Sequence, residues 1–258
     1  MNKILFLSSI ILLGVISVNA QSIRERKVRF DLQTAQYFGL NDWNRVQFAS
    51  DRLPRTSSST DLRATGNLYV INRSAGVFCD MGVGIMPAAR NWVSDPAAQA
   101  TATMGIPFYT KEIVSESGNN NTASAHFKMT FGIFGEIPIA NKLSLSPYFG
   151  IGYMNIPAPT CDAVLKAHDS NMQYKARYQW FDGYDDITSL NYLAYRLRLV
   201  HHISPKLDLL FGLEYTWYIT CADFSETYTN YFNYNIVKTV NHQGNRLNML
   251  GFSVGISF

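Results

Sequence analysis

The chain of 258 residues is poor in charge, since Asp, Glu, Lys and Arg make up only 16% of it, against about a quarter in an ordinary globular domain. Its 22 basic and 19 acidic residues leave a net charge of only +3. So small a surplus argues against a nucleic-acid-binding protein, which needs a concentrated basic surface. The apolar fraction of 47% argues against intrinsic disorder, because disordered chains combine high net charge with few apolar groups.

Long hydrophobic runs are also missing beyond residue 20, so the rest of the chain offers no candidate for a membrane-spanning helix. The first 20 residues are different. Lys3 precedes an apolar stretch that ends near Ile16, and the small residues Val18 and Ala20 flank Asn19. This pattern is typical of a secretory signal peptide. We therefore expect a signal peptide over residues 1–20 and one exported domain over residues 21–258.

Eight segments of the exported part alternate apolar and polar or small residues with a period of two. In one of them Phe127, Met129 and Phe131 alternate with Lys128 and Thr130. Such alternation predicts β-strands whose two faces meet different surroundings. The expected strands are 28–39, 62–73, 76–87, 123–138, 142–155, 189–203, 206–219 and 245–258.

The links between these segments alternate in length. Short links near 73–75, 138–142 and 204–206 alternate with long ones at 40–61, 88–122, 156–188 and 220–244. A compact soluble domain rarely has four such loops, whereas a transmembrane barrel has short turns at one end and long loops at the other. The prediction is an all-β fold, an eight-stranded antiparallel transmembrane β-barrel with long extracellular loops.

Residues 172–180 and 228–240 also alternate, and counting them would give a barrel of ten strands. That count would place the short link at Ser204 at the long-loop end. We therefore favour eight barrel strands and interpret these two segments as strand extensions above the bilayer.

The less apolar face of the strands carries glycine and serine rather than the charged residues that bulk water would favour. Examples are Gly82, Gly84, Gly150, Ser144 and Ser253. Small residues leave room for larger neighbours inside a narrow barrel. This face is therefore expected to line the lumen, and the apolar face to contact lipid.

The last nine residues, Leu250 to Phe258, alternate apolar with small residues and end in an aromatic ring. In this they resemble the terminal strand of bacterial outer-membrane proteins. With the signal peptide and the eight strands, this ending makes the chain resemble small outer-membrane barrels of the OmpA and OmpX type. The resemblance is to the barrel only, and no peptidoglycan-binding domain is expected. The resemblance implies the outer membrane of a Gram-negative bacterium, with outer-membrane lipid and lipopolysaccharide as surroundings.

Charged residues on the glycine-rich face suggest what fills the lumen. A three-residue turn centred on Pro205 places Arg196 opposite Glu214 and His202 opposite Asp208, because opposed residues must share a face. Opposite charges attract strongly in a desolvated lumen. We predict a lumen ion network of Arg196, Glu214, Arg198, Glu136 and Lys128. A charge-lined pore is the alternative interpretation of the same residues.

No catalytic, metal or cofactor site is assigned from the sequence. Some barrels of this size are enzymes that act on lipid A or peptides, and Ser124 lies two residues before His126. That pair has no acid to orient the histidine, so it is a weak signal. The histidine spacing indicates no metal site.

The long loops hold clustered aromatic residues, of which Trp180, Tyr184, Tyr231 and Tyr234 are the binding candidates. Such clusters often mark contact surfaces, although they also pack loops against each other. The expected role is either structural or one of surface interaction, in which the loops mediate adhesion or bind an extracellular ligand or protein. The alternatives are an outer-membrane enzyme and a narrow channel.

Three cysteines complete the candidates. Cys161 and Cys221 fall in different long loops on the same expected side of the barrel, and Cys79 falls on the lipid face. Export permits a disulfide between Cys161 and Cys221. It would close a loop of about 60 residues, worth about 4 kcal/mol in the chain-entropy model.

Overall fold

A computed structural model describes residues 27–40, 58–71, 74–87, 95–116, 123–157, 160–180, 187–221, 223–244 and 246–258. The expected signal peptide and Tyr184 lie outside the described residues.

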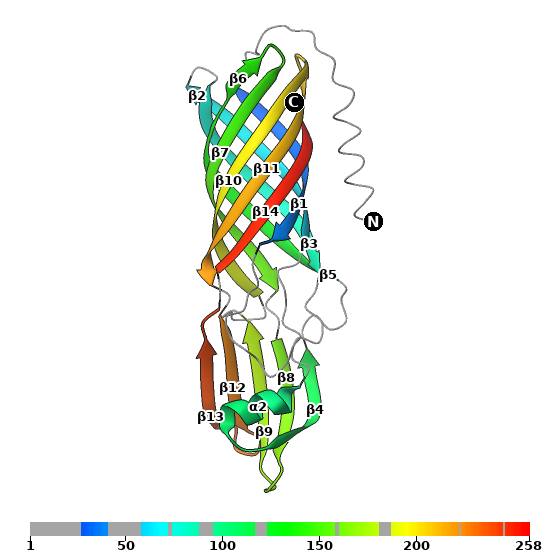
Figure 1. The fold of residues 1–258 in the computed structure, drawn as a ribbon, viewed down its shortest axis with the longest axis vertical. Helices are drawn as coiled ribbons and strands as arrows, with labels where there is room; N and C mark the ends of the chain where they lie inside the picture. Colours follow the sequence, from blue (N-terminus) through cyan, green and yellow to red (C-terminus); the bar gives the residue numbers. More distant parts are fainter. Residues whose placement is uncertain are drawn as a thin grey trace.

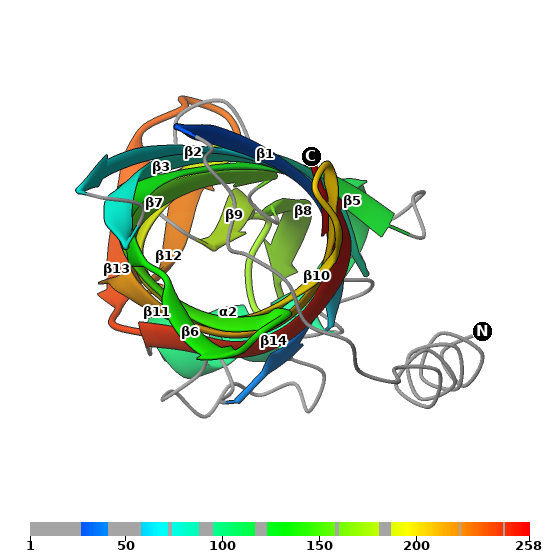
Figure 2. The same ribbon diagram turned by 90° about the horizontal axis from the view of Figure 1, so that it is seen from above.

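Eight long strands form a closed antiparallel barrel (Figures 1 and 2). Each strand pairs with the next around the ring, and the pairing of β7 with β10 completes the circle. A short strand, β6 (Ile137–Ala140), continues β5 along β7. The eight-stranded prediction is confirmed, and the ten-stranded alternative is wrong. In ring order the strands are β1 (Val28–Gly39), β2 (Ser59–Ile71), β3 (Ala75–Pro87), β5 (Ala123–Gly135), β7 (Leu143–Pro157), β10 (Ile187–Ser204), β11 (Leu207–Cys221) and β14 (Arg246–Ser257).

The barrel is apolar outside and charged inside, the reverse of a soluble protein. On β5, Phe131 and Ile133 are 54% and 61% exposed, whereas Lys128 and Thr130 between the outward residues are buried. Aromatic rings at strand ends, such as Tyr153 and Phe258, are also exposed. A closed barrel with such a belt fits lipid, since it has no sheet edge and satisfies its backbone internally. The chain is therefore an outer-membrane β-barrel of the small type.

A second sheet of five strands lies beyond the long-link end of the barrel (Figure 1). We call it the outer sheet. It consists, in spatial order, of β13 (Ile236–His242), β12 (Phe224–Asn230), β9 (Gln173–Trp180), β8 (Thr160–Ala167) and β4 (Phe108–Glu116). The expectation that residues 172–180 and 228–240 extend barrel strands is wrong, because these segments pair with each other in a separate sheet. The alternating pattern identifies a strand but not its partner.

Helix α2 (Pro96–Met104) accompanies the outer sheet (Figure 1). It begins after Asp95, whose side chain accepts a hydrogen bond from the amide of Ala98 at 2.9 Å. Pro96 suits the first turn, where its missing N–H costs nothing. Gly105 ends the helix with φ +76°, the left-handed conformation that glycine adopts without strain. No helix within the described parts of the chain is both long and apolar enough to cross a membrane.

One cluster of buried apolar side chains joins the two parts. It includes Tyr192 and Met249 of the barrel together with Leu165, Tyr178 and Tyr228 of the outer sheet. Ala97 and Ala100 of α2 belong to the same cluster. Continuous packing of this kind places the outer sheet on the mouth of the barrel.

Candidate functional site

The β10–β11 hairpin has nearly the register that its turn predicts. Arg196 lies opposite Glu214, and His202 lies opposite Asp208. The prediction fails at the turn itself. A three-residue turn centred on Pro205 would place Ile203 opposite Leu207, but the register shifts after His202 and Ser204 takes that place.

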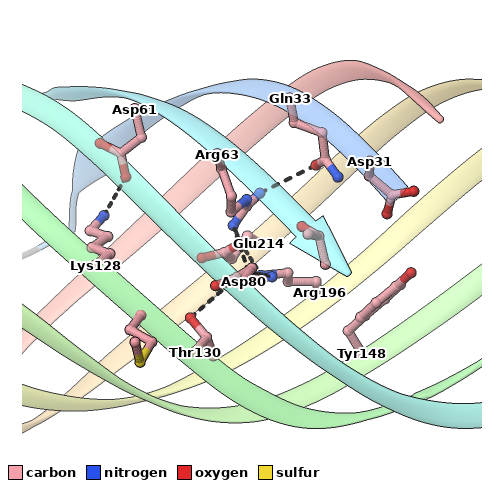
Figure 3. A network of polar contacts seen from close by, with 12 residues as sticks. Asp31, Gln33, Asp61, Arg63, Asp80, Lys128, Thr130, Tyr148, Arg196 and Glu214 are labelled. Carbon is pink, nitrogen blue, oxygen red and sulfur yellow. Dashed lines mark hydrogen bonds and ion pairs between the residues drawn. The ribbon is translucent and has the colours of Figure 1, made fainter. Parts of the chain in front are cut away.

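Glu214 lies at the centre of the lumen between two guanidinium groups (Figure 3). Its Oε2 accepts a hydrogen bond from Arg63 Nη1 at 2.6 Å and forms an ion pair with Arg196. Its Oε1 accepts a hydrogen bond from the Tyr37 hydroxyl at 2.9 Å. Arg196 also pairs with Asp80. The expected two-residue pair is therefore part of a four-residue chain of alternating charge.

The other expected lumen residues have partners too. Arg198 donates to Asp31 Oδ2 at 2.8 Å, and Lys128 donates to Asp61 Oδ2 at 2.7 Å. Glu136 accepts a hydrogen bond from Arg29 Nη1 at 2.7 Å. All five residues of the predicted network lie in the lumen, but they form several groups rather than one.

Arg29, Asp61 and Arg63 are the lumen residues that the sequence reasoning missed. Asp61 precedes the expected start of its strand, which begins at Ser59 rather than at residue 62. Arg63 lies on a strand whose outward face is weakened by Ala64 and Gly66. Asp61 and Arg63 flank Leu62, so the alternation around Leu62 already indicated that both face the lumen. Their partners could not be found in this way, because the register of a hairpin identifies only residues on adjacent strands, whereas these ion pairs cross the barrel.

Apolar and aromatic side chains fill the lumen on either side of the charges. Phe78, Phe134 and Tyr148 form one cluster toward the short turns. Tyr192 and Tyr218 lie toward the outer sheet, their ring centroids 5.5 Å apart.

The buried charged residues of the barrel include cations and anions in similar numbers: Arg29, Arg63, Lys128, Arg196, Arg198, Asp31, Asp61, Asp80, Glu136, Asp208 and Glu214.

Glycine makes this filling possible where a ring lies over its neighbour on the adjacent strand, as Tyr192 of β10 does over Gly152 of β7. A Cβ atom at Gly152 would clash with the ring of Tyr192, which is only 1% exposed. Packed side chains and mutually paired charges thus occupy the described part of the lumen.

His126 belongs to the same interior rather than to an exposed catalytic rim. Its Nε2 lies 2.8 Å from Asp61 Oδ1, and only 4% of the residue is exposed. Asp61 is the acid that the sequence could not assign, but it also pairs with Lys128. The side chain of Ser124 lies outside the described part of the structure.

The structure does not form the Cys161–Cys221 disulfide. Cys161 is completely buried in β8 of the outer sheet, where its strand neighbour is Tyr178 of β9. Cys221 ends β11 at the barrel mouth, opposite Arg246. Two links can emerge from the same end of a barrel and still belong to different sheets. Location at the same end therefore did not show that the two cysteines are close enough to form a disulfide.

Exposed aromatic residues gather at the turn between β12 and β13. Tyr231, Phe232 and Tyr234, here called the aromatic tip, are 43%, 64% and 78% exposed. The turn lies at the end of the outer sheet that is remote from the barrel (Figure 1). Tyr231 and Tyr234 are thus brought together as expected, whereas Trp180 ends β9 beside Phe224, at the other end of β12.

Hydrogen bonds fix the shape of this turn. Asn230 Oδ1 accepts from the amides of Phe232 and Asn233 at 2.9 and 3.3 Å, and the Asn230 carbonyl accepts from the amide of Tyr234 at 3.0 Å. The Tyr231 amide donates to the Gln173 carbonyl at 2.9 Å, which ties the turn to β9. The aromatic tip therefore presents its rings on a preformed loop.

A buried carboxylate supports the outer sheet beneath α2. Glu226 is completely buried and accepts hydrogen bonds from Gln99 at 2.7 Å, Thr103 at 2.8 Å and the Tyr228 hydroxyl at 2.5 Å. His242 Nε2 lies 2.7 Å from it. Burial, together with the neighbouring Glu226 carboxylate, raises the pKa of Tyr228. The arrangement fastens α2 to β12 and β13, since both oxygens of the carboxylate are occupied.

Comparison with known proteins gives distant matches of fold. No protein-family model matches the chain, and neither does any curated protein sequence. A major outer membrane protein from Thermus thermophilus is 11% identical with a TM-score of 0.45, covering 90% of this chain and 99% of that one. Neisserial surface protein A is 8% identical with a TM-score of 0.41, covering 89% and 94%.

The outer membrane protease OmpT from Escherichia coli is similar at 9% identity and a TM-score of 0.40, covering 94% of this chain and 99% of that one. Ail from Yersinia pestis, in complex with the heparin analogue sucrose octasulfate, is 11% identical with a TM-score of 0.35 and covers 90% and 100%. Values this low carry no functional argument. The barrel is established by the strand pairing of the chain itself.

Proposed function

We propose that this protein is a surface-binding protein of the outer membrane, which contacts an extracellular ligand or protein through its outer sheet. The proposal includes export by removal of residues 1–20 and an outward-facing outer sheet, since the long connections of such barrels face the exterior. The barrel serves as the membrane anchor.

The aromatic tip is the observation that carries this proposal. Exposed aromatic side chains lose solvent when a partner covers them, and clustered rings are typical of binding surfaces. Tyrosine and asparagine on a preformed loop also bind at low entropic cost, because few rotatable bonds become fixed. The sequence of this turn, from Asn230 to Asn235, contains only these two residue types and one phenylalanine.

A binding assay on the intact protein tests the proposal. The full chain, fluorescently labelled in lipid nanodiscs, is applied to panels of immobilised glycans, including heparin, and of immobilised collagen and fibronectin. We expect saturable binding to a member of the panels. Replacing Tyr231, Phe232 and Tyr234 by serine should weaken that binding by roughly tenfold or more, because a few aromatic anchors carry most of the energy of such contacts.

The matched control replaces Ile113 and Val114 by serine. These residues are 47% and 52% exposed on β4, at the opposite edge of the outer sheet. The control should bind as the wild type does. Equal binding by the tip variant and the wild type, or no binding of the wild type to either panel, would contradict the proposal.

A further inference from the structure

The charges of the barrel are sorted by sign between its interior and its outer surface. Every acidic side chain on the described barrel strands and their short turns is buried: Asp31, Asp61, Asp80, Glu136, Asp208 and Glu214. The charged side chains that are exposed or half-buried are basic, namely Lys27, Lys142 and Lys206 at the end with the short turns and Arg246 at the other end. Wherever a side chain charges the described outer surface of the barrel, the charge is therefore positive.

Two of the short turns repeat the same arrangement of an isoleucine and a lysine. Ile139 precedes Lys142 by three residues at the turn between β6 and β7, and Ile203 precedes Lys206 by three residues at the turn between β10 and β11. Ile139 and Ile203 are 53% and 45% exposed. Lys206 is exposed, and Lys142 is half-buried. Each turn thus places a cation just beyond an exposed apolar side chain.

These two turns are neighbours at the rim of the barrel. The His202 amide donates to the Lys142 carbonyl oxygen at 2.8 Å, which holds the first turn against β10, the strand that leads into the second. His201 is half-buried and faces away from the lumen, because the adjacent His202 points inward to Asp208. Since β10 lies between β7 and β11 in the ring, the imidazole of His201 lies between the strands that follow Lys142 and Lys206.

The ammonium groups of the two lysines are free to bind an anion. Among the described residues, no ion pair or hydrogen bond occupies the side chain of Lys142 or Lys206. Lys175 of the outer sheet, by contrast, lies 3.9 Å from Asp162 Oδ2. Basic clusters at a membrane boundary attract anionic headgroups, because the attraction acts within a Debye length of the lipid surface. The two turns therefore provide positive charge at the place where lipid headgroups lie.

We propose that the β6–β7 and β10–β11 turns form a binding site for an anionic phospholipid, with phosphatidylglycerol as the probe that represents this class. The phosphate lies between Lys142 and Lys206, and the acyl chains lie along the exposed isoleucines. Lysine suits this position, because its stem packs on apolar surface while its ammonium group reaches the headgroups. A soluble anion would gain the charge contact alone, whereas a lipid also gains the apolar contact.

This site goes beyond the proposed function. It lies at the end of the barrel that is remote from the outer sheet (Figure 1). With the outer sheet directed outward, the site meets the leaflet that faces the periplasm. The serine variant of the aromatic tip should therefore bind phospholipid as the wild type does, which separates failure of the lipid site from failure of ligand binding.

Native mass spectrometry of the full chain in a neutral detergent tests the site. The protein is titrated with dioleoylphosphatidylglycerol or dioleoylphosphatidylcholine, which share their acyl chains but differ in net charge. We expect the wild type to bind phosphatidylglycerol roughly tenfold or more tightly than phosphatidylcholine, because two lysines act on one anionic headgroup. Replacing Lys142 and Lys206 together by glutamine should reduce this preference to about twofold or less. Replacing both by arginine should retain it.

The matched control replaces Lys111 and Lys175 of the outer sheet by glutamine, which removes the same amount of charge far from the site, and should keep the wild-type preference. Equal affinity of the wild type for the two lipids would overturn the proposal, as would a preference that survives in the double glutamine variant. An equal loss in the control would also overturn it, since net charge rather than the turns would then select the lipid. Displacement of phosphatidylglycerol by an equal concentration of glycerol phosphate would overturn the assignment to a lipid.

Discussion

At the scale of single residues, Glu214 is central to the effect that substitutions in the lumen have on the stability of the barrel. Its carboxylate pairs with both Arg63 and Arg196, and all three side chains are buried. An apolar pair in place of Arg196 and Glu214 would remove two charges but leave Arg63 with Asp80 as its nearest acid, 3.8 Å away. The energetic unit is therefore the group, not the pair.

Glu214→Gln should lower the free energy of unfolding by about 3–5 kcal/mol, because two buried guanidinium groups lose their shared counter-charge. Denaturant unfolding of the protein in detergent micelles measures the change. The joint substitution Arg196→Met with Glu214→Leu should cost much less, because Arg63 and Asp80, 3.8 Å apart, remain as an ion pair. A loss below about 1 kcal/mol for Glu214→Gln would show that the charges are solvated, contrary to their burial.

Much of this residue-level picture could be predicted from the sequence. The turn at Pro205 correctly placed Arg196 opposite Glu214, because period-two alternation permits only registers that keep both charges on one face. Arg63 and Asp80 could not be assigned as partners in this way. They reach Glu214 and Arg196 across the lumen, and closure of the barrel, not pairing of neighbours, sets those distances.

At the scale of elements, the outer sheet depends on buried tyrosines as well as apolar side chains. Burial raises the pKa of Tyr178, and burial together with the Glu226 carboxylate raises the pKa of Tyr228, both above the ordinary value of 10.0. The Tyr178 hydroxyl donates to the Pro96 carbonyl at 2.8 Å, so it too fastens α2 to the sheet. Both groups must remain protonated in the folded element.

We expect the outer sheet to lose stability as the pH rises above 10.0, the ordinary tyrosine pKa. The unfolded chain then releases protons that the folded sheet retains, so the stabilisation is complete below that pKa and declines above it. Limited proteolysis between β8 and β9, followed from pH 8 to 12, measures the opening. A double variant with phenylalanine at Tyr178 and Tyr228 should show a shallower decline. Ionisation of both tyrosines at their ordinary pKa in an uncut sheet would contradict the prediction.

Only part of the outer sheet was visible in the sequence, as the alternating segments 172–180 and 228–240; β4, β8 and the arrangement of the strands were not. Residues 172–180 alternate as clearly as a barrel strand does, and an alternating pattern gives no information about which sheet a strand joins. Helix α2 was missed altogether, since its nine residues are mainly small and its start depends on one capping side chain, Asp95. Three of the expected long links contribute to this sheet, and its arrangement depends on contacts between them.

At the scale of the whole molecule, the barrel and the outer sheet present different surfaces. The barrel exposes an apolar belt and fills its interior, so that its contacts are with lipid and with itself. The outer sheet exposes polar side chains and the aromatic tip, which are the groups that the proposed partner would contact. This division favours an anchored binding protein over a conduit, because the features available to a partner lie outside the membrane.

The filled lumen predicts that the wild-type barrel has no steady conductance in planar lipid bilayers. Ion passage would require separating buried pairs such as Lys128 with Asp61 and Arg198 with Asp31, and displacing the rings of Tyr192 and Tyr218. Single-channel recording at 1 M salt is a stringent measurement, since high salt raises any ionic current and weakens only exposed charge pairs. Protease treatment of the recovered bilayers, which should cut the outer sheet and spare the barrel, verifies that the protein was inserted. A steady, reproducible conductance from inserted protein would show that the lumen is a pore, and would change the role of its charges from packing to pore lining.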